Sequence, residues 1–399
     1  MNRPRGNASA KAAWLAVATS LALANVGVVP GAAASPVSLQ DGHGLHVVGV
    51  QPLDARLLAV TVSTPALPGT ARIRILLPAG YATDPSRRYP VFYLLHGTSG
   101  GAEDWTTKGN AEQATAGLPL IVVMPDIALN DGGGGWCTNW YNQGHYGQPQ
   151  WETFHIDELI PWVDQNLRTI ASREGRAIAG LSQGGFCSIS YPARYPDLFS
   201  IALAYSGAPN IAHDLDSELG STLIINLTEV TLDGAPPNSM FGDRATEQIN
   251  WEDHDPDTLA PNLRNTDLFM YFGNGAPGPL DPSPVNPGAT PIEALVARDN
   301  VEFHDRLISL GIPSHYDAYG PGTHSWPYWD RDLMWSLGPI MDDFAHPPAR
   351  PRRVNYTVAD PEYSVYGWQV VMYRPAMEFS TLANADGKGF SLAGSGTGL

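Results

Sequence analysis

Five short runs of nearly continuous apolar residues constrain the fold of this chain more than any other feature. They occupy residues 90–95, 118–124, 176–181, 199–205 and 267–272. Such runs are typical of strands covered on both faces, as in parallel sheets. Patterns typical of helices lie between or after them, at residues 151–167, 186–194 and 291–310. The alternation predicts an α/β fold with a mostly parallel central sheet and helices on both faces.

The two ends of the chain differ from this pattern. Short β-prone runs at 46–50, 57–64 and 71–77 are separated by Pro and Gly and predict leading antiparallel strands. Near the other end, residues 346–353 combine three prolines with three arginines and are interpreted as a linker. We therefore expect one large domain over residues 35–345 and a small β-like appendage over residues 354–399.

The first residues have the composition of an export signal. Three basic residues precede an apolar run at 12–29, and alanines at 32–34 provide a small-residue cleavage site. We expect residues 1–34 to be a signal peptide, which makes the protein secreted or associated with the cell envelope. An uncleaved membrane anchor is the alternative. No integral membrane segment is expected once the signal is removed.

Charge and cysteine content limit the possible partners and bonds. The formal net charge is −17, which argues against binding nucleic acid or an anionic membrane surface. The chain has two cysteines, Cys137 and Cys187. In an oxidising compartment they are a possible disulfide, and two buried thiols are the alternative.

One motif follows the central apolar run directly. Residues 180–184 read Gly-Leu-Ser-Gln-Gly, which is the G-x-S-x-G pattern of a nucleophile elbow. A serine hydroxyl is a poor nucleophile at neutral pH, so it needs a sharp turn that exposes it and a base that takes its proton. The pattern also arises as an ordinary Gly/Ser turn, but its place between a strand and a helix favours Ser182 as a nucleophile.

A base should follow the nucleophile, and His324 fits that role. It lies on a short loop after the β-prone residues 314–319 and before a final helical segment. Loop placement after the last strand favours His324 over five other histidines that follow Ser182, although a lone histidine is often only a surface or core residue. The competitors are His213, His254, His304, His315 and His346.

An acid is needed to orient the base, and spacing does not choose it. Six acids precede His324 at tolerable distances: Asp281, Glu293, Asp299, Glu302, Asp305 and Asp317. The tetrahedral intermediate also needs hydrogen-bond donors. The residue after the nucleophile, Gln183, provides one backbone N–H, and the Gly-rich loop 94–101 provides a second candidate at Thr98.

These residues point to a known family. Three segments carry the resemblance, and they occur along the chain in the same order as in that family: 151–154, 271–275 and 322–329, the last of which reads Gly-Thr-His-Ser-Trp-Pro-Tyr-Trp. Across residues 71–344 the chain resembles the secreted mycolyltransferases of the antigen 85 type. They belong to the wider esterase D-like group, with S-formylglutathione hydrolases and feruloyl esterases. The resemblance implies an α/β-hydrolase fold.

The resemblance also assigns roles to individual residues. It implies that His324 is the base, that Glu293 is the orienting acid, and that Thr98 and Gln183 donate to the oxyanion. Mycolyltransferases carry Asp-Gly-x-Arg in the first oxyanion loop, whereas residues 96–99 read His-Gly-Thr-Ser here. The His-Gly form is similar to the general esterase branch. Transfer to trehalose is therefore in doubt, while acyl-enzyme chemistry is not.

Three further side chains are candidate substrate contacts: His96, Trp326 and Trp136. Trp140 and Tyr141 are aromatic neighbours that could also line the pocket. For all four of these aromatic residues the alternative is that they only pack in the core or in loops.

The sequence thus predicts a secreted serine esterase that forms an acyl-enzyme on a small-molecule, lipid or sugar ester. The chemistry needs no metal or cofactor. Two alternatives stay open. One is a cell-envelope acyltransferase that passes the acyl group to trehalose or another sugar. The other is a non-catalytic adhesin or binding protein on the same fold.

Overall fold

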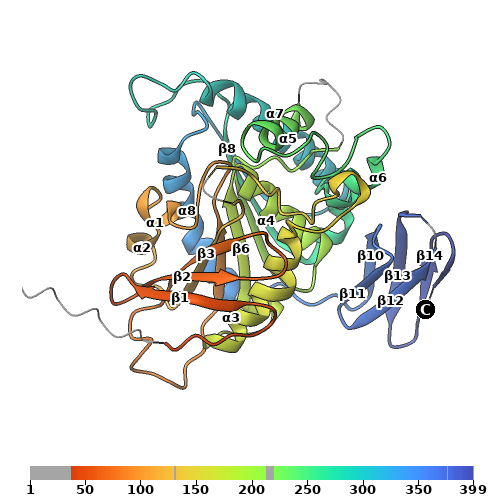
Figure 1. Ribbon diagram of the computed structural model, residues 1–399, viewed down its shortest axis with the longest axis horizontal. Helices are drawn as coiled ribbons and strands as arrows, with labels where there is room; N and C mark the ends of the chain where they lie inside the picture. Colours follow the sequence, from red (N-terminus) through yellow and green to blue (C-terminus); the bar gives the residue numbers. More distant parts are fainter. Residues whose placement is uncertain (1–36, 130–131, 213–219, 375, 399) are drawn as a thin grey trace, which may run out of the picture. The chain divides into compact units, whose positions relative to one another are not determined.

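A nine-stranded mixed sheet forms the centre of the computed structural model, which describes residues 37–129, 132–212, 220–374 and 376–398 (Figure 1). The strand order is β1-β2-β3-β5-β4-β6-β7-β8-β9. The strands are β1 (His46–Pro52), β2 (Leu57–Ser63), β3 (Thr70–Leu76), β4 (Val91–Leu95), β5 (Ile121–Pro125), β6 (Arg176–Leu181), β7 (Ile201–Tyr205), β8 (Asp267–Gly273) and β9 (His315–Gly320).

The sheet has an antiparallel and a parallel part. β1, β2 and β3 pair antiparallel with one another, and β3 pairs antiparallel with β5. From β5 through β4 to β9 all pairings are parallel. The predicted fold class, a mostly parallel sheet preceded by antiparallel strands, is confirmed.

The apolar runs are buried because helices cover both faces of the parallel strands. Successive residues of a strand point to opposite faces, and β4 shows the result. Val91, Tyr93 and Leu95 belong to one apolar cluster, together with residues of α3, α4 and α7. Phe92 and Leu94 belong to a second cluster, which includes residues of α1, α2 and α8.

The helices alternate with the strands along the chain. They are α1 (Asp104–Thr107), α2 (Ala111–Ala114), α3 (Ile160–Asn166), α4 (Gln183–Arg194), α5 (Ser221–Thr231), α6 (Gln248–His254), α7 (Ala289–Leu310) and α8 (Trp326–Ala345), with the short turns η1 (Asn142–Gly144), η3 (Arg173–Gly175) and η4 (Ala260–Asn265). None of the helices in the described part of the chain is long and apolar enough to cross a membrane.

One helix differs from its sequence-based expectation. The segment predicted as a single helix over 151–167 contains a π-helical stretch, η2 (Thr153–Leu159), before α3 begins. Pro161 lies in the first turn of α3 and has no N–H to donate to the preceding turn, which is compatible with the wider turn before it.

The C-terminal residues form two small antiparallel sheets, which confirms the predicted β appendage. One sheet has the order β10-β13-β14 and the other β11-β12-β15. These strands are β10 (Val354–Val358), β11 (Glu362–Val365), β12 (Trp368–Tyr373), β13 (Ser380–Asp386), β14 (Gly389–Ala393) and β15 (Thr397–Gly398). They enclose an apolar core of their own, which includes Tyr356, Val365, Val370 and Leu382. We call these strands the C-terminal module.

Candidate active site

Ser182 occupies a strained turn between the end of β6 and the start of α4. Its backbone has φ +53° and ψ −120°, a region that non-glycine residues rarely adopt. Hydrogen bonds hold the turn on both sides, because its N–H donates to the carbonyl of Tyr205 (2.9 Å) and its carbonyl accepts from the N–H of Gly185 (2.9 Å). The side chain stands at the carboxyl edge of the parallel strands, where α/β sheets bind their ligands.

Glycines flank Ser182 because backbone approaches backbone on either side of it. A Cβ atom at Gly180 would lie 2.2 Å from the carbonyl oxygen of Gly184. A Cβ atom at Gly184 would lie 2.2 Å from the carbonyl oxygen of His96. Both of these contacts are with backbone atoms, which cannot shift without disturbing the sheet. Glycine at these two positions therefore allows α4 to begin in direct contact with β6 and the 96–101 loop.

His324 and Glu293 form a buried hydrogen-bonded pair. Nδ1 of His324 lies 2.7 Å from Oε2 of Glu293, whose side chain is fully buried. The other carboxylate oxygen of Glu293 accepts from the hydroxyl of Ser206 (2.8 Å) and from the N–H of Gly273 (2.6 Å). Within the described part of the chain, Nε2 of His324 is buried and has no hydrogen-bond partner. It is therefore available to a hydroxyl group in the adjoining pocket.

The other acids considered in the sequence have different partners. Asp281 accepts from the hydroxyls of Thr323 and Tyr328 and from the N–H of Gly278 (2.7 Å), so it shapes the loop beside His324 without bonding to its ring. These hydrogen bonds outweigh the effect of burial and leave the pKa of Asp281 below its usual value.

Two more of these acids, both on α7, are bonded to residues other than His324. Asp299 accepts from Ser221 (3.3 Å) and Glu302 from Asn210 (2.9 Å). No hydrogen bond joins Asp305 or Asp317 to His324 among the interactions that the structure describes. Glu293 is the acid of this group that contacts the imidazole.

The oxyanion candidates Thr98 and Gln183 are brought side by side. Gln183 is the first residue of α4, where backbone N–H groups have no acceptor within the helix. In the amide orientation that pairs donors with acceptors, its side chain donates to Oγ1 of Thr98 (2.8 Å) and accepts from the N–H groups of Trp136 (2.8 Å) and Gly135 (3.1 Å). The amide thus links the elbow to both neighbouring loops.

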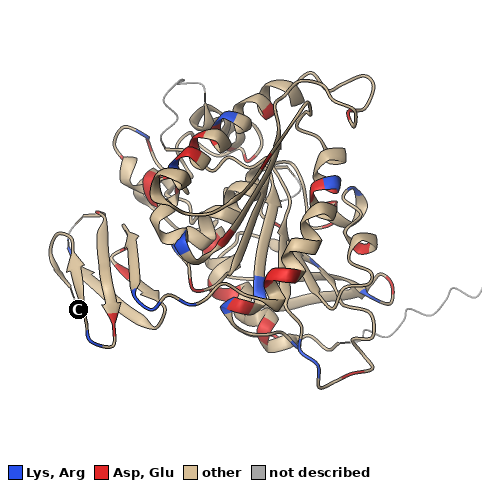
Figure 2. Cartoon of the chain, turned by 180° about the vertical axis from the view of Figure 1, so that it is seen from behind, with Lys and Arg blue, Asp and Glu red and all other residues tan. Residues whose placement is uncertain are grey.

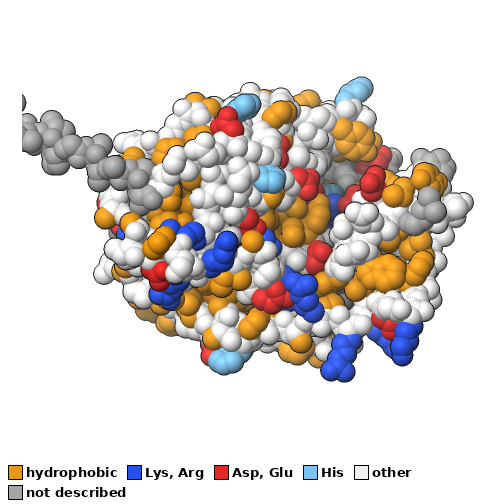
Figure 3. Space-filling view, turned by 90° about the horizontal axis from the view of Figure 1, so that it is seen from below, with side chains coloured by type: hydrophobic (Ala, Val, Ile, Leu, Met, Phe, Trp, Pro, Cys, Tyr) orange, Lys and Arg blue, Asp and Glu red, His pale blue; other side chains and the backbone are white. Residues whose placement is uncertain are grey.

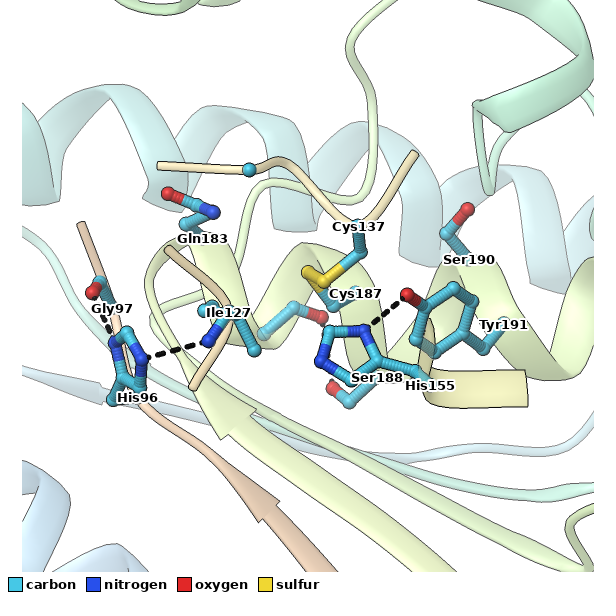
Figure 4. The surroundings of a disulfide bond; sticks show 12 residues. His96, Gly97, Ile127, Cys137, His155, Gln183, Cys187, Ser188, Ser190 and Tyr191 are labelled. Carbon is cyan, nitrogen blue, oxygen red and sulfur yellow. Dashed lines mark hydrogen bonds between the residues drawn. A yellow bond between two sulfur atoms is a disulfide. The ribbon is translucent and has the colours of Figure 1, made fainter. Parts of the chain in front are cut away.

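The structure does not place His96 and Trp136 in the pocket. His96 is fully buried, with Nδ1 2.7 Å from the carbonyl of Gly97 and Nε2 accepting from the N–H of Ile127 (2.9 Å), as Figure 4 shows. Burial lowers the pKa of His96. Trp136 is also buried and packs on Phe186. The prediction that His96 and Trp136 contact substrate does not agree with these positions, because protein atoms already surround both rings.

A pocket of about 420 Å³ opens beside Ser182 and His324. Trp326, the third predicted substrate contact, lies in its wall. Lys108 pairs with Asp104 (2.9 Å) and stands 5.7 Å from the centre of the Trp326 ring. The other lining residues are Gly97, Thr98, Ser99, Gly100, Leu181, Pro282, Asn286, Ser325, Pro327 and Trp329.

A disulfide joins Cys137 to Cys187 near the elbow (Figure 4). The disulfide links the loop of Gly135 and Trp136, whose N–H groups donate to the Gln183 amide, with the second turn of α4. Beside it, His155 is buried between the hydroxyl of Tyr191 (2.8 Å) and the carbonyl of Asp126 (2.9 Å). Burial lowers the pKa of His155 to about 4.

Sequence reasoning missed two kinds of residue at this site. Ser206, which follows β7, donates to Glu293, and the rings of Trp329 and His324 pack nearly perpendicular to each other with their centres 4.9 Å apart. The position of Ser206 at the carboxyl end of a parallel strand was the signal that could have found it. No group of three or more His, Cys, Asp or Glu residues is placed to hold a metal ion in the described ranges.

Comparison with known proteins identifies the family. Residues 64–339 match a family model described as "Putative esterase". The chain belongs to this esterase family. The suspected resemblance is confirmed, because its relatives include both esterases and antigen 85 mycolyltransferases. Membership supports an enzyme that hydrolyses or transfers acyl groups.

Two relatives show how far the similarity extends. Esterase Rv1288 of Mycobacterium tuberculosis is 33% identical over 293 residues, which cover 72% of this chain and 60% of the relative. This chain therefore spans less than two thirds of that relative's length. Diacylglycerol acyltransferase/mycolyltransferase Ag85B of Mycolicibacterium smegmatis is 32% identical over 253 residues, covering 61% of this chain and 73% of the relative.

Solved structures agree on the fold. The structure of Mycobacterium tuberculosis MPT51 superposes with a TM-score of 0.58 at 25% identity and covers 72% of this chain and 99% of its own. A fluorophosphonate-binding serine hydrolase of Staphylococcus aureus, FphF, superposes with a TM-score of 0.52 at 19% identity, covering 71% of this chain and 97% of its own. The second likeness shows the fold alone.

Proposed function

We propose that this protein is a serine esterase that works through an acyl-enzyme on Ser182. The observation that carries the proposal is the arrangement of His324. One ring nitrogen is bonded to the buried Glu293, and the other has no partner within the described residues, in a pocket that Ser182 also lines. A base held in one tautomer beside a serine hydroxyl that faces a pocket is what acyl transfer to serine requires.

The proposed reaction has two halves. Oγ of Ser182 attacks the ester carbonyl carbon while Nε2 of His324 takes the hydroxyl proton. The carbonyl oxygen becomes negatively charged and accepts hydrogen bonds from the N–H groups of Gln183 and Thr98. The intermediate collapses, and the leaving alcohol takes the proton from His324. Water then attacks the acyl-enzyme by the same steps and releases the acid.

Glu293 acts on His324 rather than on the substrate. Its carboxylate fixes the proton on Nδ1 and stabilises the imidazolium that forms when Nε2 takes up a proton. Ser206 and Gly273 donate to its second oxygen and keep the carboxylate in place. Because the pair is buried, its interaction is screened less than a surface pair would be.

A sugar acceptor in place of water is the second candidate. Relatives named diacylglycerol acyltransferase/mycolyltransferase favour it, since both reactions share the acyl-enzyme. The oxyanion loop disfavours it, because residues 96–99 contain no Asp or Arg and His96 is buried among main-chain groups. Incubation with a p-nitrophenyl ester and trehalose separates the two. We expect free acid only, and acylated trehalose would establish the transferase.

We also propose that the protein is exported, with a signal peptide at residues 1–34, a hydrolase domain at 35–345, a linker at 346–353 and a C-terminal segment at 354–399. The signal lies outside the described residues. Its composition supports export, and the Cys137–Cys187 disulfide fits an oxidising compartment.

Covalent labelling tests the proposed nucleophile. A fluorophosphonate should label the wild-type protein and fail to label Ser182→Ala, while Ser86→Ala, which changes an exposed turn, should label normally. Peptide mass spectrometry locates the label. A wild-type protein that does not react would favour the non-catalytic binding protein.

A further inference from the structure

The C-terminal module carries a groove that the esterase fold does not explain. The module lies beyond residues 64–339, which match the esterase family. A hollow of about 570 Å³ is formed by the linker, β12 and the β13–β14 hairpin. Ser182 and His324 line a different pocket. The groove is therefore a separate feature of this chain.

Aromatic rings are the main apolar groups in the groove. Trp368 and Phe390 lie 5.3 Å apart with their planes at 63°, and Tyr366 lines the same hollow. Phe390 is 57% exposed. Burying an aromatic ring would stabilise so small a module, so a ring left exposed beside other aromatic rings is typical of a binding surface. Among the described residues that line the groove there is no Leu, Ile or Met, so its largest apolar side chains are the three aromatic ones.

The groove is cationic within an acidic protein. The chain has a net charge of −17, but Arg350, Arg352 and Arg353 gather at the entry to β10, where Figure 2 shows a basic segment. Seen from below in Figure 3, basic side chains lie beside apolar ones toward the right of the view. The carboxylate in the groove, Asp386, is bonded to Arg353 (3.2 Å).

One guanidinium remains available to a ligand. Arg350 is committed to Glu174, with its Nε 2.6 Å from a carboxylate oxygen. Arg352 is exposed, lines the groove, and has no hydrogen-bond or ion-pair partner among the residues that the structure describes. A guanidinium presents paired N–H donors that match a carboxylate in shape and charge.

We propose that this groove binds a polysaccharide that contains uronic acid residues. The C–H faces of pyranose rings stack on aromatic rings such as Trp368 and Phe390, and the uronate carboxylate pairs with Arg352. A single unpaired guanidinium fits a singly charged carboxylate better than a phosphate, which usually gathers several cations. The flat aromatic lining, without long aliphatic side chains, fits sugar rings better than an amphipathic helix or acyl chains.

A hydrogen bond and an ion pair join the module to the hydrolase part of the chain. Tyr366 donates to the carbonyl of Pro196 (2.7 Å), and Asp360 pairs with Arg194 (2.8 Å). These contacts join the module to residues at the C-terminal end of α4 and just after it, the helix that begins next to Ser182. If the proposed esterase function holds, esters borne on acidic polysaccharides become its substrate class.

Binding of polygalacturonate tests the groove directly. Affinity electrophoresis of the full chain in gels with polygalacturonate, or with neutral dextran, measures retention without any turnover. We expect retention by polygalacturonate and not by dextran, and the same retention for Ser182→Ala. Phe390→Ala and Arg352→Gln should each weaken binding about tenfold or more. The failure of esterase activity would leave these results unchanged, so the two proposals are tested separately.

A matched control comes from the same strand as Trp368. Tyr373 is 59% exposed on β12 but does not line the groove, so Tyr373→Ala should bind as the wild type does. Trp368→Ala should abolish binding, and circular dichroism shows whether the module still folds. The proposal is overturned if the wild type is not retained, if dextran retains it equally, if Phe390→Ala and Arg352→Gln bind normally, or if it binds phospholipid vesicles instead.

Discussion

The imidazole of His324 contacts a charged carboxylate and an apolar aromatic ring. A fully buried carboxylate contacts Nδ1, and the ring of Trp329 packs nearly perpendicular to the imidazole, while Nε2 has no hydrogen-bond partner among the described residues. The sequence could place His324 on its loop but left six acids open. Only the resemblance pointed to Glu293, because which carboxylate reaches the ring depends on how α7 packs against the end of β8.

Replacing the acid should reduce the rate without unfolding the protein. Glu293→Gln keeps the side-chain shape but removes the charge that stabilises the imidazolium. We expect kcat for a soluble p-nitrophenyl ester to fall by about 10²–10⁴, with a larger fall for His324→Ala.

Asp281→Asn is the comparison for this experiment. Asp281 binds residues next to His324 but not its ring, so its replacement should cost about tenfold or less. Equal losses in Asp281→Asn and Glu293→Gln would contradict the assignment of Glu293.

The two candidate substrate contacts that do not line the Ser182 pocket share one property. His96 and Trp136 lie on loops near Ser182, yet their side chains turn inward to main-chain and aromatic partners. Sequence spacing fixes a residue's position along a loop, whereas the direction of its side chain depends on contacts made across the fold. His96 Nε2 finds the N–H of Ile127, which is 31 residues away.

At the scale of elements, the strands were the most predictable feature. Continuous apolar runs gave all five predicted parallel strands, because burial on both faces needs apolar residues at every position. β9 has a mixed, partly exposed pattern and lies at the edge of the sheet. The groove of the module could not be predicted, because it depends on how the linker meets two hairpins.

The close contact between α4 and the 96–101 loop predicts how an added methyl group at Gly184 affects stability. Gly184→Ala places a Cβ atom 2.2 Å from the carbonyl oxygen of His96, so backbone must move. We expect a loss of about 3 kcal/mol in the free energy of unfolding, measured with urea.

Gly117→Ala is the control, because a Cβ atom there meets nothing within 4 Å. Its free energy of unfolding should change by less than about 1 kcal/mol. A Gly184→Ala protein of normal stability would show that α4 does not start where the structure places it.

The disulfide connects two elements that both serve the elbow. It closes a loop of 50 residues, and by chain entropy its removal should cost about 4 kcal/mol. The double variant Cys137→Ala/Cys187→Ala should therefore unfold at lower urea concentration. The wild type should shift to match it when a reductant is added, and no shift would mean that the bond does not form.

For the molecule as a whole, buried histidines set a limit on acid stability. His155 has a pKa of about 4 in the fold and about 6.5 in an unfolded chain, so the unfolded chain binds the proton first as pH falls. Its contribution to stability is complete above pH 6.5 and is lost as pH falls toward 4.

His155→Gln isolates this contribution. Between pH 7 and 4.5 the wild type should lose on the order of 2 kcal/mol more unfolding free energy than the variant does. Carboxyls with raised pKa values, such as Asp233 at about 6 and Asp332 at about 7, stabilise the fold as pH falls and so oppose the effect of His155. They are present in both proteins, so their effect cancels in the comparison. Identical pH profiles would show that His155 is not buried as described.

The formation of an acyl-enzyme on Ser182 is the central claim, and intact-protein mass spectrometry tests it most directly. The enzyme is mixed with excess p-nitrophenyl acetate and quenched in acid within the first turnovers. We predict a mass increase of one acetyl group, which peptide mapping places on Ser182 and which Ser182→Ala lacks. Turnover without an adduct, or an adduct on another residue, would contradict the account.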